Sequence, residues 1–221
     1  ELTGDTARRH AEYLGLPAEL FRRPHICEFG RSDSLKDKDK AVEAFALVAK
    51  QEQNINMFLN LDEGMEPGVA RRIREIIERD GLEDRIHIFS PRELPQTGAG
   101  SQILPNLLRS ARTFLTMSVM EGFGMAACEA AACGIPIVGT EHIPVVTDVI
   151  APAGGGTVVA GKDVEAAAEA VLGYIRMDEA SWNEVSQAAH DSVVPRYSWQ
   201  RIVTDMFEQV REKGFSLECV G

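Results

Sequence analysis

Two glutamates eight residues apart mark the segment MEGFGMAACEAAACG (Met120–Gly134). Glu121 and Glu129 place carboxylates among small, apolar side chains, where a buried carboxylate requires hydrogen-bond donors. Sugar and ribose hydroxyls are such donors. Between the glutamates, Gly122 and Gly124 allow a ligand to approach the backbone, and the free amides at a helix start bind phosphate. The pattern favours a ligand with hydroxyls at both ends and a diphosphate between them, as in a nucleotide-sugar.

The same segment permits other interpretations. GFGMAA fits G-x-G-x-x-A, the dinucleotide-binding pattern, with Glu141 about 20 residues further on. That pattern normally follows the first strand of its fold directly, whereas here it follows the fourth expected strand, after an intervening VME. A dinucleotide site is therefore the weaker interpretation. Glu129 could also simply face solvent or stabilise the helix dipole.

Positive charge in this acidic chain follows the first expected strand, in GRSDSLKDKDK. Arg31 and Lys36 are the candidates to stabilise a diphosphate as it leaves, because that step needs cationic groups or a metal. A surface salt bridge is the alternative for Arg31, and it is the expected arrangement for Lys38 and Lys40. No metal site is expected, since DKD (residues 37–39) is more typical of a helix start and the five histidines lack ligand spacing.

Alternating strand-like and helical patterns must position these groups. Six apolar runs are expected as strands: His25–Gly30, Ile55–Leu61, Arg85–Ser90, Thr113–Ser118, Ile135–Thr140 and Gly154–Ala160. Helices are expected at Asp39–Gln51, Gly68–Gly81, Asp163–Met177, Ser181–Val193 and Trp199–Glu212, with short ones at 103–111 and after Gly124. This order predicts an α/β fold, a doubly wound parallel sheet of about six strands that binds ligands beyond the carboxyl ends of its strands.

Composition narrows the class of protein. The chain has 221 residues, of which 44% are hydrophobic and 26% charged, and its net charge of −11 argues against nucleic-acid binding. No apolar run approaches the roughly 20 residues of a transmembrane segment, and no signal-peptide pattern opens the chain. The four cysteines (Cys27, Cys128, Cys133 and Cys219) form no C-x-x-C and are expected to be free thiols, mostly buried, in the cytoplasm. Residues 1–23 are expected to be a connecting segment, and residues 24–221 the domain.

Four landmarks, in order, resemble the nucleotide-sugar-binding half of a retaining glycosyltransferase of the GT-B fold, in family 4. They are G-R-x-x-x-x-K followed by E-A-F, an E-x7-E segment with GIPIV beyond it, the glycine-rich GGGTVVA, and the closing YSWQRIVTDMF. The resemblance covers about residues 24–212. It implies a Rossmann-like domain, a UDP-, GDP- or ADP-sugar as donor, and metal-independent transfer without a cofactor.

The resemblance also implies residue roles. Arg31 and Lys36 would hold the donor diphosphate and stabilise it as it leaves, while Glu121 would bind hydroxyls of the donor sugar. Glu129 would hold the ribose hydroxyls. The candidate catalytic residues are Arg31, Lys36 and Glu121, and the candidate substrate-binding residues are Gly30, Gly122, Phe123, Gly124, Met125 and Glu129. Recognition of the base is expected from the backbone near Ser90–Glu93.

The chain departs from the family pattern in two loops. Asp37 stands where glycine often follows the lysine, and EHIPV (Glu141–Val145) replaces G-G-x-P-E beside the donor pocket. An N-terminal acceptor-binding domain is expected as the partner of this domain within a longer enzyme, so the domain alone should have little activity. The alternative is a non-catalytic nucleotide or nucleotide-sugar binding module; an NAD-dependent oxidoreductase is less consistent with the sequence.

Overall fold

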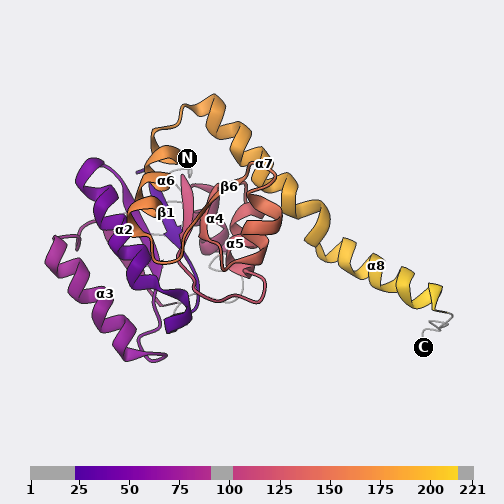
Figure 1. Ribbon diagram of the computed structural model, residues 1–221, viewed down its shortest axis with the longest axis horizontal. Coiled ribbons are helices and arrows are strands. Elements are labelled where there is room, and N and C mark those ends of the chain that lie inside the picture. Colours follow the sequence, from indigo (N-terminus) through magenta and orange to yellow (C-terminus); the bar gives the residue numbers. More distant parts are fainter. Residues whose placement is uncertain (1–22, 91–101, 214–221) are drawn as a thin grey trace.

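The computed structural model describes residues 23–90 and 102–213. They form an all-parallel sheet with the strand order β3-β2-β1-β4-β5-β6 (Figure 1). The strands are β1 (His25–Glu28), β2 (Asn56–Asn60), β3 (Ile86–Phe89), β4 (Thr113–Thr116), β5 (Ile137–Thr140) and β6 (Gly156–Val159). The order reverses between β1 and β4, which makes that edge the switch point of a doubly wound sheet. The predicted fold and its six strands are confirmed.

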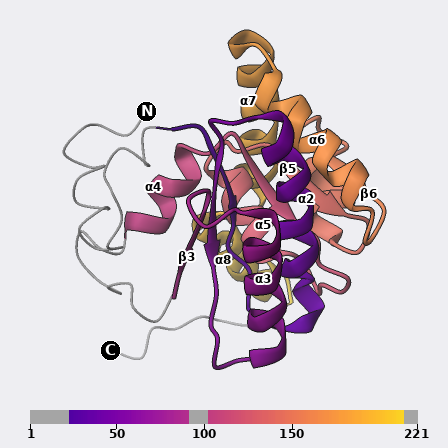
Figure 2. The same ribbon diagram turned by 90° about the vertical axis from the view of Figure 1, so that its left-hand side faces the viewer.

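Helices cover both faces of the sheet (Figures 1 and 2). One face packs against α2 (Lys38–Gln51), α3 (Pro67–Asp80) and α6 (Val164–Arg176), and the other against α4 (Ile103–Arg109), α5 (Met125–Ala132) and α7 (Glu179–Tyr197). Successive side chains of a strand point to opposite faces, so Ile26 joins the first apolar core and Cys27 the second.

Three helical features differ from the expectation or sharpen it. The helix expected at Ser181–Val193 is longer and spans Glu179–Tyr197 as α7. It starts earlier because Asp178 caps its first turn by accepting from the Ser181 amide at 3.0 Å. The segment after β5 forms the π-helical turn η5 (Val146–Ile150), which the sequence pattern did not predict. Gly81 ends α3 in the left-handed conformation, as predicted.

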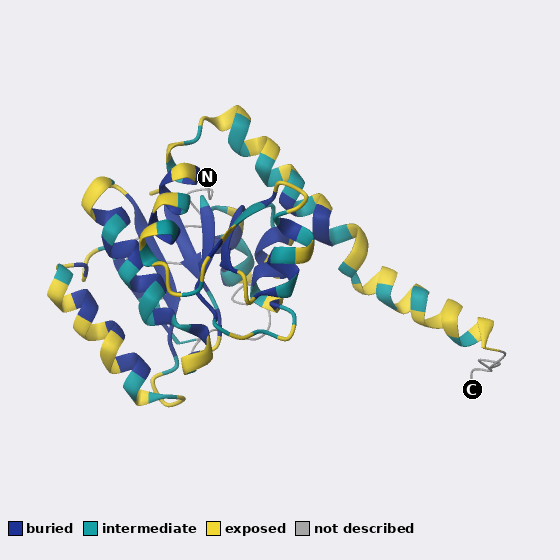
Figure 3. Cartoon of the chain, in the orientation of Figure 1, coloured by how far each residue is buried: buried dark blue, intermediate teal, exposed yellow. Residues whose placement is uncertain are grey.

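The last helix, α8 (Trp199–Glu212), extends away from the sheet and its helical layers (Figure 1), and none of its residues is buried (Figure 3). The apolar side chains of Trp199, Val203, Met206 and Phe207 recur at helical spacing and are 42–81% exposed. The described residues therefore leave one apolar face of α8 uncovered. Within the described ranges, no helix is long and apolar enough to cross a membrane.

The described cysteines are free thiols. Cys27 and Cys128 are buried as expected, and Cys133 is half-buried. Burial raises the pKa of the Cys27 thiol well above its usual value. Cys219 lies outside the described residues, as does nearly all of the expected connecting segment at residues 1–23.

The buried imidazole of His87 gives folding a pH dependence. Burial lowers the pKa of His87 to about 4, and the positive charges of His25 and Arg23 add to this shift. Because the unfolded imidazole has a pKa of about 6.5, the unfolded state binds more protons, and this contribution to stability is lost as pH falls from about 6.5 to about 4. We therefore expect the melting temperature of a His87→Leu variant to fall less than that of the wild type when the pH is lowered from about 6.5 to about 4. Thermal unfolding followed by circular dichroism checks this, and parallel pH profiles would contradict it.

Candidate functional site

The carboxyl ends of β1 and β4, on either side of the switch point, carry the first part of the site. The Lys36 ammonium donates to Glu121 Oε1 although 85 residues separate them, and their side chains are 10% and 18% exposed. Ser118, two residues beyond β4, donates to the same carboxylate oxygen at 3.3 Å. The structure therefore brings together two of the three candidate catalytic residues, as the parallel sheet predicts.

A short turn after β1 sets the position of Lys36. Asp33 caps the 3-10 turn η2 (Ser34–Lys36) by accepting from the Leu35 amide at 3.1 Å. The Leu35 carbonyl then accepts from the Val119 amide at 2.9 Å. This backbone bond ties the loop after β1 to the loop after β4, so the two loops hold Lys36 and Glu121 at a fixed separation.

Gly30 lies in the tightest part of the first loop. Its amide donates to Glu28 Oε1 at 3.0 Å, and a Cβ added at Gly30 would stand 2.8 Å from that oxygen and 3.5 Å from Cδ of Lys36. Any larger residue would push these groups apart. Because Glu28 uses the Gly30 amide, Gly30 contributes space for the Lys36 stem rather than a donor for phosphate.

Lys38 corrects a prediction. It was expected in a surface salt bridge, but its side chain is 0% exposed and its ammonium lies 2.6 Å from Glu28 Oε2. Burial lowers the pKa of Lys38, and the Glu28 carboxylate opposes that shift. The reason is that Lys38 opens α2 where the helix meets the ends of β1 and β2. Lys40, two residues further on, pairs with Glu43 at 2.7 Å and stays partly exposed, as expected.

Arg31 is not brought to the Lys36–Glu121 pair. Its guanidinium lies 2.9 Å from Asp33 Oδ2, and its side chain is 67% exposed. This is the surface salt bridge that the sequence left as the alternative. Such an exposed pair is worth only about 0–1 kcal/mol, so an anionic ligand could readily replace Asp33 as the partner of Arg31.

The start of α5 supplies the second part of the site. Gly124 precedes the helix with φ +103°, and a Cβ there would lie 2.5 Å from Cγ2 of Ile143 and 3.0 Å from Cγ1 of Val145. Glycine is required at this position because the conformation is left-handed and the loop after β5 packs against it. Val145, where the family carries an acidic residue, is buried and donates its amide to the Phe123 carbonyl at 3.0 Å.

Gly122 differs from Gly124, since nothing described lies within 4 Å of a Cβ added there. Its backbone is open to an approaching ligand. The first amides of α5, from Met125 onward, have no partner within the helix, so this end of the helix carries partial positive charge. It lies next to Gly122 in the chain. A phosphate between Lys36 and this helix start would therefore meet positive charge on two sides.

Glu129 lines a separate pocket of about 380 Å³ between α5, α7 and the start of α8. The pocket walls include Phe123, Met125, Tyr197 and Trp199, and the Phe123 and Tyr197 rings meet edge to face with centroids 5.0 Å apart. Much of the Glu129 side chain remains exposed, yet partial burial among these apolar groups raises the pKa of its carboxyl. Glu129 thus lines a pocket to which neither Lys36 nor Glu121 contributes.

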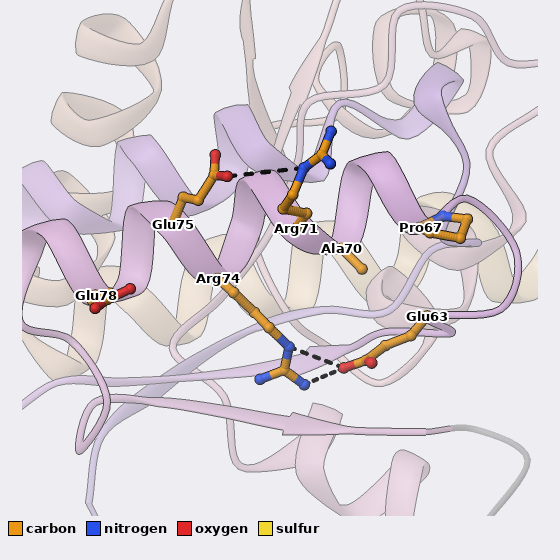
Figure 4. A pocket seen from close by; sticks show the side chains of 7 residues that line it. All are labelled: Glu63, Pro67, Ala70, Arg71, Arg74, Glu75 and Glu78. Carbon is orange, nitrogen blue, oxygen red and sulfur yellow. Dashed lines mark hydrogen bonds and ion pairs between the residues drawn. The ribbon is translucent and has the colours of Figure 1, made fainter.

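Two other hollows lie at or near the other half of the sheet. The first, at the carboxyl ends of β2 and β3, is lined by Leu61, Asp62 and Ser90 among others. Of the loop expected to recognise the base, only Ser90 is described; residues 91–93 lie outside the described ranges. The second hollow runs beside α3, where its charged residues pair with one another: Arg74 with Glu63, and Arg71 with Glu75 at 3.9 Å (Figure 4). None of the predicted site residues lines it.

Sequence reasoning missed the polar groups beneath the site. Glu28, Lys38 and Asn60 are buried, and Lys38 contacts both of the others. Thr140 of β5 donates to the Ser118 carbonyl. The available signal was a glutamate inside the apolar run HICEFG, which requires a buried cationic partner. In the part of the chain that the structure describes, no cluster of three or more His, Cys, Asp or Glu side chains could hold a metal ion.

A family model described as "Glycosyl transferases group 1" matches residues 21–190. The chain is 27% identical over 212 residues to D-inositol 3-phosphate glycosyltransferase of Xylanimonas cellulosilytica, an alignment that covers 94% of this chain and 46% of that protein. The chain spans less than half the length of the curated relatives that it matches.

Solved structures share the fold. Anabaena HepE in complex with UDP-glucose superposes with a TM-score of 0.76 at 17% identity, over 96% of this chain and 54% of that one. The C-terminal domain of a glycosyl transferase group 1 family protein from Francisella tularensis superposes with a TM-score of 0.68 at 19% identity, over 86% and 94%. The chain therefore has the fold of one GT-B half.

Proposed function

The chain belongs to the glycosyl transferases group 1 family, and on that premise we propose that it is the donor-binding domain of a retaining glycosyltransferase. The enzyme would transfer a sugar from a nucleoside diphosphate sugar to an acceptor hydroxyl. The observation that carries the proposal is the Lys36–Glu121 pair at the switch point, beside the positive end of α5. It combines a cation for a diphosphate with a carboxylate for sugar hydroxyls.

The donor would enter by replacing the ion pair. Its diphosphate takes the Lys36 ammonium and the exposed Arg31 guanidinium, and both charges stabilise the diphosphate as the sugar leaves. The Glu121 carboxylate, freed from Lys36, accepts hydrogen bonds from the sugar hydroxyls. The open backbone of Gly122 and the first amides of α5 lie on the path between them. These two cations supply the charge that a metal supplies in other transferases.

Titration calorimetry of this domain with UDP, GDP, ADP and NAD tests the proposal. We expect one of the nucleoside diphosphates to bind and NAD to give no response. Binding of NAD alone would contradict the proposal and favour a dinucleotide enzyme. A diphosphate that binds, in a full-length protein that transfers no sugar, would instead favour the alternative of a non-catalytic binding module.

Glu129 is proposed to hold the ribose hydroxyls from the pocket between α5 and α8. A hydrogen bond to a charged group contributes about 1.5–3 kcal/mol, so Glu129→Ala is expected to weaken binding of the preferred nucleoside diphosphate about 10- to 100-fold. The 2′-deoxy form of that nucleotide should bind the wild type more weakly but should not be discriminated by the variant. Glu169→Ala, an exposed glutamate of α6 on the other face of the sheet, is the matched control. Equal affinity of wild type and Glu129→Ala would refute this role.

An acceptor-binding domain is proposed as the partner of this one within the same protein. Two observations support it: the matched relatives are more than twice as long as their aligned parts, and the apolar face of α8 is uncovered in the described residues. This domain alone is accordingly proposed to be inactive in transfer. A reading frame that encodes no second α/β domain upstream of Glu1 would contradict the partner.

The free thiols of Cys27, Cys128 and Cys133 support a reducing compartment, and we place the protein in the cytoplasm. Cell fractionation with a periplasmic marker tests this placement. Recovery of the protein with that marker would overturn it.

A further inference from the structure

We propose that the buried ion pair of Glu28 and Lys38 is a positioning pair, which holds Lys36 and the loop after β1 in the geometry that binds the donor diphosphate. The ligand named here rests on the proposed function, whereas the positioning itself concerns groups within the chain. Neither residue is a fixed position of the motifs that carry the family resemblance. Their part in the site follows from four contacts.

Lys38 joins the ends of two strands. Its ammonium lies 2.6 Å from Glu28 Oε2 at the end of β1, and it donates to the Asn60 carbonyl at 2.6 Å and to Asn60 Oδ1 at 2.7 Å at the end of β2. The ammonium thus combines an ion pair with Glu28 and two hydrogen bonds to Asn60. Since Lys38 also opens α2, one side chain fixes the helix start against both strands.

Glu28 carries this constraint to the loop. While Oε2 meets Lys38, Oε1 accepts from the Gly30 amide at 3.0 Å and turns that amide inward. The Lys36 stem then passes over Gly30, with Cδ 3.5 Å from where a Cβ would be. A series of contacts thus runs from Asn60 through Lys38 and Glu28 to Gly30. The absence of a side chain at Gly30 leaves the space beside it for the stem of Lys36, whose ammonium contacts Glu121.

The physics of buried charge argues that this pair serves more than stability. Replacing a buried ion pair by apolar residues of similar volume is often neutral or stabilising, whereas removing one partner alone is strongly destabilising. Stability by itself would therefore be served as well by two apolar side chains. Apolar side chains cannot, however, accept a hydrogen bond from the Gly30 amide. They therefore cannot hold the loop after β1 in its position.

Two double variants separate these roles. Glu28→Leu/Lys38→Met removes both charges and the acceptor of Gly30, and Glu28→Gln/Lys38→Met removes both charges but keeps that acceptor. We expect both to fold, with the first weakening binding of the preferred nucleoside diphosphate at least about tenfold and the second about three- to tenfold, because glutamine keeps the acceptor but has lost the ammonium that anchors it to β2. Lys40→Met, which breaks an exposed pair on the same helix, should change nothing. Wild-type affinity in a folded Glu28→Leu/Lys38→Met variant overturns the inference.

Amide hydrogen exchange, measured by NMR without ligand, keeps the inference separate from the proposed function. The Gly30 amide should exchange slowly in the wild type, faster in Glu28→Gln/Lys38→Met and fastest in Glu28→Leu/Lys38→Met. Unchanged exchange overturns the positioning role even if the wild type binds no nucleotide, a result that would refute only the proposed function. Should both doubles unfold, Asn60→Ala takes their place: faster Gly30 exchange and weaker binding support the inference, and wild-type values of both refute it.

Discussion

Replacing Lys36 by methionine is expected to weaken binding of the preferred nucleoside diphosphate about 10- to 100-fold, and to lower transfer by the full-length enzyme about 10²- to 10³-fold. The larger effect on transfer follows because the diphosphate gains negative charge as it leaves, when the ammonium is needed most. The methionine keeps the stem that packs over Gly30 but removes the charge. Calorimetry and steady-state kinetics measure the two effects. Lys40→Met makes the same substitution four residues later and should leave both unchanged.

Glu121→Gln provides the complementary result. It removes the carboxylate that pairs with Lys36 in the absence of donor, so the affinity for the nucleoside diphosphate alone should be retained or increased. Transfer should nevertheless fall, because Glu121 is proposed to bind the sugar hydroxyls. If Lys36→Met binds the diphosphate as tightly as the wild type, Lys36 does not contact it, and the proposed site is wrong.

The second large effect concerns the fold at the start of α5. Gly124→Ala is expected to lower the free energy of unfolding by about 2–5 kcal/mol, since the left-handed conformation costs roughly 1–2 kcal/mol and overpacking about 1–3 kcal/mol. The added methyl group would stand 2.5 Å from Cγ2 of Ile143 and 3.0 Å from Cγ1 of Val145. Urea denaturation measures this loss of stability, provided that the m-value, the slope of unfolding free energy against urea concentration, is the same for both proteins.

Gly122→Ala is the matched control for Gly124→Ala, because the two glycines are separated only by Phe123. Gly122 has open space around it and does not adopt positive φ, so its substitution should change stability by less than about 0.5 kcal/mol. The same variant should weaken donor binding if the donor approaches the Gly122 backbone. Equal destabilisation by the two substitutions would show that the packing of Ile143 and Val145 does not set the requirement for glycine.

Much of the site could be read from the sequence because it depends on topology. Once alternating strands and helices predict a parallel sheet, the carboxyl ends of its strands must share one edge. Lys36 follows β1 and Glu121 follows β4, so both were expected at that edge, and there they form an ion pair. The sequence did not predict that Glu129 lines an aromatic pocket, because residues of α7 and α8, far along the chain, form part of that pocket.

The sequence by itself determined the class of fold, the order of its elements and the edge at which the chemistry lies, because hydrophobic period and connection length are local properties. Only the tertiary structure decided which charged side chains are buried and which partner each of them has. Arg31, Lys36, Lys38 and Lys40 occupy one short basic segment, yet the first and last form exposed or partly exposed pairs while Lys38 is enclosed. Whether a lysine is buried depends on which acceptors lie within its reach, and those of Lys38 come from two different strands of the sheet.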